Sequence, residues 1–181
     1  ISIKRSHRAT AGLTVLGMNI ALLSAVVPMV SGETASIAVT GLMVVDGIAR
    51  LSMALILATT LGVLTLCHAY FEGYKDNREE IYLLIGIATL GALTLACAQH
   101  VATLLLGLEL LGLPMVGAVA YSVGERRSIE GGIKYLALSG AASATLLFGF
   151  ALIYADTGVL DVPGLAKLIA GASLDQPLVL T

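Results

Sequence analysis

The fold is decided by one long apolar run, IYLLIGIATLGALTLACAQHVATLLLGLELLGLPMVGAVAYS, which occupies residues 81–122. About 20 apolar residues of α-helix cross the hydrocarbon core of a bilayer, which is about 30 Å thick. One straight helix over the whole run would be about twice as long as the bilayer is thick. The run must therefore fold back once. Gln99 and His100 are the polar pair near its middle, so we expect a tight turn there between spanning helices at 81–98 and 101–122.

Three further apolar stretches have spanning length, at residues 10–30, 47–71 and 129–155. The segments between the stretches are polar, and EGYKDNREE, residues 72–80, carries six charged residues. The sequence therefore predicts an all-α fold. It is a polytopic transmembrane helical bundle of about five complete spans, which together form a single transmembrane domain over residues 1–181.

Residues 156–175 differ from the spans in composition. They contain too many Gly, Pro and Asp residues to cross a bilayer, so we expect a loop with a short surface helix around residues 164–170. The chain begins with Ile, and KRSHR follows at once. We expect a fragment of a longer subunit, in which an earlier helix ends at residues 1–3 and PLVLT, at the end, opens a further span.

Composition excludes several classes of function. Of the 181 residues, 57% are hydrophobic and 12% are charged, whereas a soluble domain carries about 25% charged residues. The mean hydropathy is +0.95. The formal net charge is −2. Nucleic-acid binding would be expected to need a strongly basic surface, so this class of function is excluded. Cys67 and Cys97 lie in apolar runs without the spacing of a metal or redox motif, and we interpret them as small buried hydrophobic residues.

The distribution of basic residues predicts the orientation in the membrane. If the spans alternate in direction, residues 1–9, 72–80 and 123–128 lie on one side. These three loops hold seven basic residues, and the opposite side has one or two. Short basic loops remain in the cytoplasm. We therefore expect these loops to lie in the cytoplasm, or in the equivalent compartment of an organelle, and residues 156–175 to be non-cytoplasmic. The seven residues are Lys4, Arg5, Arg8, Lys75, Arg78, Arg126 and Arg127.

A few charged residues interrupt the spans. Arg50 lies one turn inside the second span, where an arginine can extend to the headgroups. Glu109 lies near the middle of its span, in LLLGLELLGLP. A charge there costs roughly 2.5–3.5 kcal/mol by insertion scales, so such residues usually face a protein interior or a hydrated path. Lys134 lies about two turns into the next span, and Glu130 precedes it by four residues.

The geometry of Glu109 and Lys134 does not favour a direct ion pair. Counted from their shared loop, the two residues differ in depth by about 10 Å at the helical rise. We expect a relation bridged by water, unless Lys134 pairs with Glu130 at the i, i+4 spacing. An alternative is that Lys134 lies near the membrane edge and simply extends to the surface.

Other features of the fourth span support a polar site near Glu109. Pro114 cannot donate a hydrogen bond to the carbonyl of Leu110, and the free acceptor lies beside the carboxylate. The glycines of this span, and SGAAS at residues 139–143 of the next span, favour close helix contact. We therefore expect these two spans to pack as a hairpin. His100 is a candidate proton relay, although at the predicted turn it is more typical of an interface residue.

The sequence shows no nucleophile elbow, glycine-rich phosphate loop, zinc spacing or pair of haem ligands. Independent covalent, nucleotide or redox chemistry therefore has no recognisable site, and no metal or cofactor is assigned. Movement of ions through the membrane remains the function that the residues favour.

Three stretches resemble a known family: EGYKDNREEIYLLIGIATLG, LLLGLELLGLPMVG and RRSIEGGIKYLALSGAASATLLFG. They are similar to the N-terminal part of subunit N of the bacterial proton-pumping NADH-quinone oxidoreductase, respiratory complex I, an antiporter-like membrane subunit. The resemblance extends from about residue 11 to about residue 160. It implies that the five spans are the second to sixth helices of that subunit. Family members have about fourteen helices, so the remainder of the proton route lies outside these 181 residues.

The resemblance also implies roles for individual residues. Glu109 matches a glutamate of the fifth helix, and Lys134 matches a lysine of the sixth helix; both belong to a polar, hydrated axis. Flavin, iron-sulfur clusters and quinone would be bound by other subunits, so no cofactor is expected in this chain. The expected partners are the other membrane subunits of complex I, the lipid bilayer, protons and water, and no nucleic acid.

The mechanism that we expect is a protonatable switch. Glu109 would bind or release a proton according to the charge of nearby lysines, chiefly Lys134 and one lysine beyond the C-terminus. Two alternatives remain open. The chain is a membrane subunit of a monovalent cation/proton antiporter, or it is a structural scaffold subunit in which these charges serve assembly.

Overall fold

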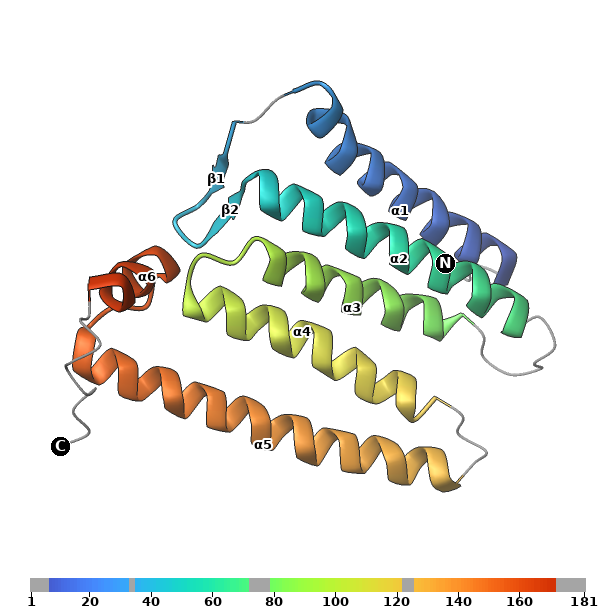
Figure 1. Ribbon diagram of the computed structural model, residues 1–181. Coiled ribbons are helices and arrows are strands. Elements are labelled where there is room, and N and C mark those ends of the chain that lie inside the picture. The colour runs from blue at the N-terminus through green and yellow to red at the C-terminus, as the bar shows by residue number, and fades with distance from the viewer. Residues whose placement is uncertain (1–6, 33–34, 72–78, 122–125, 172–181) are drawn as a thin grey trace, which may run out of the picture.

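The computed structural model describes residues 7–32, 35–71, 79–121 and 126–171 (Figure 1). The described residues form six helices and one small hairpin. The helices are α1 (His7–Val30), α2 (Gly47–Phe71), α3 (Glu80–Ala96), α4 (Val101–Val119), α5 (Arg126–Thr157) and α6 (Val162–Gly171), and the strands are β1 (Ile37–Val39) and β2 (Met43–Val45).

The long helices α1 to α5 lie side by side in chain order and alternate in direction (Figure 1). Each helix contacts its neighbour in the sequence, and α1 also contacts α3. The hairpin, the turn between α3 and α4, and α6 gather at one end of the helices. The end of α2, the start of α3, the end of α4 and the start of α5 lie at the other end. The predicted all-α polytopic membrane fold is confirmed.

Helix lengths fit a membrane-spanning bundle. In the described part of the chain, four helices are long and apolar enough to cross a membrane: α1, α2, α4 and α5. α3 is apolar but has only 17 residues, which is the short end of the range for a spanning helix. The predicted turn at Gln99 and His100 is present between α3 and α4. Most of the loops expected at 1–9, 72–80 and 123–128 lie outside the described residues.

The best-buried packing joins α1, α2 and α3. Leu64 and Tyr82 are almost completely enclosed, and Ala11 and Ile81 complete the cluster. The buried Tyr82 hydroxyl lies 3.3 Å from Nδ1 of His68 on α2. A tyrosine in such a place usually has a partner for its hydroxyl, so this contact fixes α3 against the last turn of α2.

The hairpin was not predicted, and it is bound into the bundle by backbone hydrogen bonds. The amide of Val44 donates to the carbonyl of Cys97, and the amide of Gln99 donates to Leu42. In turn, the carbonyl of Gln99 accepts from Val162 at the start of α6. The hairpin, the α3–α4 turn and the α5–α6 connection therefore form one hydrogen-bonded cluster, which closes this end of the bundle.

Arg50 is also part of this end, and the expectation that it extends to the headgroups is wrong. The side chain is only 5% exposed, and its Nη2 donates a hydrogen bond of 2.9 Å to the carbonyl of Ala35. A buried guanidinium must be hydrogen-bonded to offset its desolvation. Arg50 therefore holds the segment before β1 against the beginning of α2.

Candidate functional site

Glu109 lies in the middle of α4. Its side chain is exposed, as are Leu106 and Leu113 at 64% and 58%. These residues are three before and four after Glu109, so the three form one face of the helix. Within the described residues, Glu109 makes no hydrogen bond or ion pair. It is a carboxylate on an otherwise apolar outer face.

The opposite face of α4 is fixed by very close contact with α3. A Cβ added at Gly91 of α3 would lie 2.7 Å from the carbonyl carbon of Leu110 and 2.9 Å from the carbonyl oxygen of Gly107. A Cβ added at Gly107 would lie 3.1 Å from the backbone nitrogen of Leu95. Small residues allow backbones in membranes to approach in this way. The predicted close approach therefore occurs at Gly107, and the neighbour is α3.

Pro114 lies on the buried face of α4. Because its ring nitrogen carries no hydrogen, the carbonyl of Leu110 lacks the donor that an ordinary residue at position 114 would supply. This carbonyl belongs to the residue after Glu109. The turn of α4 that lacks this hydrogen bond is therefore next to the Glu109 carboxylate, as the sequence predicted. α3 packs against the same turn at Gly91.

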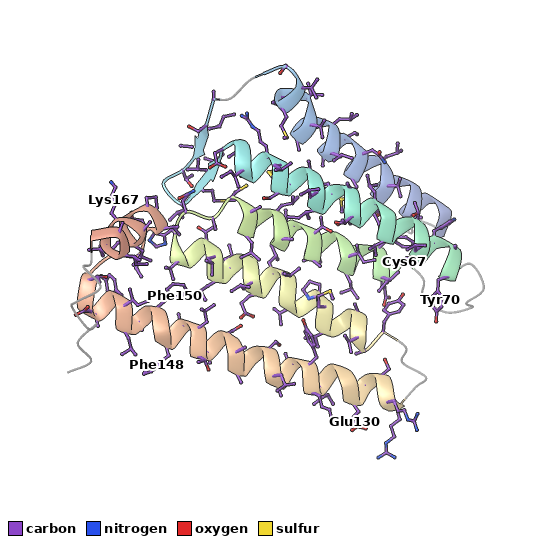
Figure 2. All side chains as sticks on the ribbon, viewed as in Figure 1. Cys67, Tyr70, Glu130, Phe148, Phe150 and Lys167 are labelled. Carbon is purple, nitrogen blue, oxygen red and sulfur yellow. The ribbon has the colours of Figure 1, made fainter. Side chains whose placement is uncertain are left out.

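Lys134 is paired with Glu130, not with Glu109. Lys134 Nζ lies 2.6 Å from Glu130 Oε1, and the side chains are 70% and 59% exposed. Figure 2 shows Glu130 near the start of α5. The i, i+4 pairing that the sequence left open is therefore present.

The register between α4 and α5 explains why Lys134 and Glu109 do not meet. A Cβ at Gly132 would lie 2.7 Å from Cβ of Ala120 and 3.4 Å from the carbonyl oxygen of Val116. Lys134 is therefore at about the level of Val116, and Glu109 lies about 10 Å deeper at the helical rise. Glu109 lies on α4 and Lys134 on α5, as expected, but the structure does not bring the two side chains into contact.

The packing of α4 with α5 uses a different segment from the one expected. The two helices do pack as a hairpin, and the Ser128 hydroxyl donates to the carbonyl of Val119. The contact is made by the diglycine at 131–132. The SGAAS segment at 139–143 makes no comparably close approach, since nothing lies within 4 Å of a Cβ at Gly140. A run of small residues permits close packing, but it does not select the partner helix.

His100 occupies the N-cap of α4. Its Nδ1 accepts a hydrogen bond of 3.1 Å from the amide of Ala102. The His100 side chain therefore satisfies one of the backbone amides at the start of α4 that have no partner within the helix. This contact gives His100 a structural role, and its role as a relay stays a prediction.

Two comparisons with known proteins agree with this architecture. Residues 98–180, which begin just before α4, match the family described as NADH:quinone oxidoreductase/Mrp antiporter, TM. Over this part of the chain, which contains α4, α5 and α6, the protein is similar to antiporter-like membrane domains.

The second comparison is with a solved structure, described as respiratory complex I from Thermus thermophilus with bound Aureothin. One of its chains is 29% identical to this chain, with a TM-score of 0.72. The match covers 86% of this chain and 33% of that chain. The chain described here thus spans about a third of the length of its structural relative.

Proposed function

We propose that this chain is part of an antiporter-like, proton-translocating membrane subunit of an NADH-quinone oxidoreductase, and that Glu109 binds and releases the transported proton. One observation carries the proposal. A carboxylate lies at mid-span on the outer face of an apolar helix, within the region that matches the antiporter-like family.

The exposed position of Glu109 requires a neighbour. A mid-bilayer charge facing acyl chains is costly, so ionisable residues in spans almost always face protein or water. Among the described helices, α3 covers the opposite face of α4, where Gly91 and Gly107 meet, and α5 contacts α4 only near its end, at Val116 and Ala120. The face with Glu109 is therefore the side where further protein or a hydrated path would supply polar contacts.

The energy required is compatible with a switch at one carboxylate. A hundredfold change in the proton affinity of a group corresponds to about 2.7 kcal/mol. Moving one charge through 100 mV costs about 2.3 kcal/mol. A change in the charge around Glu109 that alters its proton affinity a hundredfold would thus supply enough free energy to move one proton against a membrane potential of about 100 mV. Lys134, about two turns away along the helix axis, is the described cation best placed to contribute.

The finer parts of the proposal follow the sequence resemblance. The subunit is subunit N, in a bacterial inner membrane, with residues 1–9, 72–80 and 123–128 in the cytoplasm. Its partners are the other membrane subunits of respiratory complex I. Flavin, iron-sulfur clusters and quinone belong to other subunits in this proposal.

The test is Glu109→Gln in the intact complex, with proton pumping per electron as the measurement. Glutamine keeps the size of the side chain and removes its ability to carry a proton. Asp156→Asn, near the exposed end of α5, is the matched control. We expect Glu109→Gln to lower the pumping ratio and the control to leave it unchanged. An undiminished ratio in the assembled Glu109→Gln complex would reject the proposal.

The description of the matching family supports a second candidate, a subunit of a monovalent cation/proton antiporter. In that case, proton movement in membrane vesicles would depend on sodium or potassium and not on NADH oxidation. A third candidate is a structural scaffold subunit, in which these charges serve only assembly. Variants without the charges that assemble normally but do not pump protons would exclude the scaffold.

A further inference from the structure

The ion pair between Glu130 and Lys134 has no role in the function proposed above. It spans one turn of α5, and Gly131 and Gly132 lie between its two residues in the sequence. Gly132 is buried against the end of α4, so this turn is anchored while both charged side chains remain on the exposed side. Within the described part of the chain, Glu130 is the one hydrogen-bonding partner of Lys134.

The direction of the pair determines its effect. Side chains on a helix lean toward its N-terminus, and α5 begins at the end of the bundle where α4 finishes. Pairing with Glu130 therefore draws the Lys134 ammonium toward that end. Glu109 lies in the opposite direction, about 10 Å deeper. In the observed conformation, Glu130 keeps the amine away from Glu109.

The geometry points to Glu130 as a positioning residue that competes with Glu109 for the charge of Lys134. This inference rests on the proposed function. While the pair is closed, the ammonium is distant and partly neutralised, so Glu109 retains a proton more readily. When the pair opens, the long and flexible lysine side chain extends along α5, and its charge favours the carboxylate form of Glu109.

A weak pair suits this purpose. A single contact between two flexible side chains, Lys134 Nζ and Glu130 Oε1, forms the pair, so the amine can move without any change in the helix. A buried pair with ideal geometry would hold the lysine permanently.

Other charged or titratable groups surround the pair, and the experiment must account for them. Arg126 lies four residues before Glu130 on the same face of α5, so it is a competing cation. The other described groups near this end of the packed helices are Arg127 and Tyr135 on α5, Tyr121 after α4, and Glu79, Glu80 and Tyr82 at the start of α3. A variant of Lys134 is therefore needed to show that Glu130 acts through that residue.

The experiment measures proton pumping per electron against pH in membrane vesicles that contain the intact complex. Glu130→Gln removes the competing acid. The amine then spends more time near Glu109, and proton binding there requires a lower pH. We expect the alkaline limb of the profile to move to lower pH by about half a unit or more, since an approaching opposite charge changes a carboxyl group's proton affinity by at least this order. Glu130→Asp should restore the limb at least in part, and Asp156→Asn should leave it unchanged.

The decisive comparison uses Lys134→Met. If Glu130 acts through the lysine, Glu130→Gln should cause no further shift in the Lys134→Met background. An unchanged profile for Glu130→Gln alone, or an equal shift with and without Lys134, would overturn the inference. These outcomes leave the proposed function intact, because the proposed function is tested by Glu109→Gln. Undiminished pumping in Glu109→Gln would reject both the proposed function and this inference.

Discussion

Replacing Gly91 by alanine should disturb the contact that positions Glu109. The new Cβ would lie 2.7 Å from the carbonyl carbon of Leu110 and closer still to the backbone nitrogen of Leu111. Ordinary contacts of a Cβ begin at 3.4 Å. Because these neighbours are backbone atoms in a close-packed interface, α3 and α4 must separate by about 0.7 Å or more.

The cost can be separated from the general effect of alanine on a helix. Overpacking of this kind costs about 1–3 kcal/mol, while alanine gains up to about 1 kcal/mol over glycine in a helix interior. Gly86→Ala, also on α3, makes the same gain without a clash, because nothing lies within 4 Å of a Cβ there. The difference between the two variants isolates the clash.

The assay is thermal unfolding of the full-length subunit reconstituted in lipid. We expect the midpoint of Gly91→Ala to lie several degrees below that of Gly86→Ala. Proton pumping should fall with it, since the face of α4 that bears Glu109 moves when its support moves. Equal midpoints would refute the packing of α3 against α4 described here.

Two further predictions concern the end of the bundle that holds the hairpin and the turn between α3 and α4. Arg50→Met removes the charge-assisted hydrogen bond to the carbonyl of Ala35, which is worth about 1.5–3 kcal/mol; limited proteolysis should then cleave residues 35–46 faster, and an unchanged rate would contradict this role. His100→Asn keeps a side chain that caps helices well and removes the titratable ring. It should leave pumping unchanged, whereas His100→Ala should lower the free energy of unfolding by about 1 kcal/mol; loss of pumping in His100→Asn would support the relay instead.

The spans could be predicted because bilayer thickness and helical rise leave few alternatives. α2 has the predicted bounds, 47–71, and the turn at Gln99 and His100 is where the run of 42 residues had to fold back. α5 extends slightly further at both ends than the predicted 129–155. The ends of helices depend on caps and neighbours, which hydropathy does not record.

The hairpin and the burial of Arg50 could not be predicted in this way. β1 and β2 have three residues each, too few for a clear alternating pattern. The hydrogen bonds from β2 and from the turn before it to Cys97 and Gln99 join segments more than 50 residues apart. The same tertiary contacts give Arg50 a partner within the protein, so a residue predicted to reach the headgroups is buried.

The face on which Glu109 lies was also beyond the sequence. Leucines surround it on all sides of α4, so no periodicity distinguishes the inner from the outer face. The pairing of Lys134 with Glu130 depends on local i, i+4 spacing and could be foreseen as an alternative. The choice between the two acids required the register of α5 against α4, which Gly132 and Ala120 determine.

The central claim is that the Glu109 carboxylate gains and loses a proton while the complex works. Infrared difference spectra of the membrane-bound complex, recorded between its oxidised and reduced states, measure this directly through the stretching band of protonated carboxyl groups. The account predicts a band that disappears in Glu109→Gln and persists in Asp156→Asn. An unaltered carboxyl band in the assembled Glu109→Gln complex would contradict it.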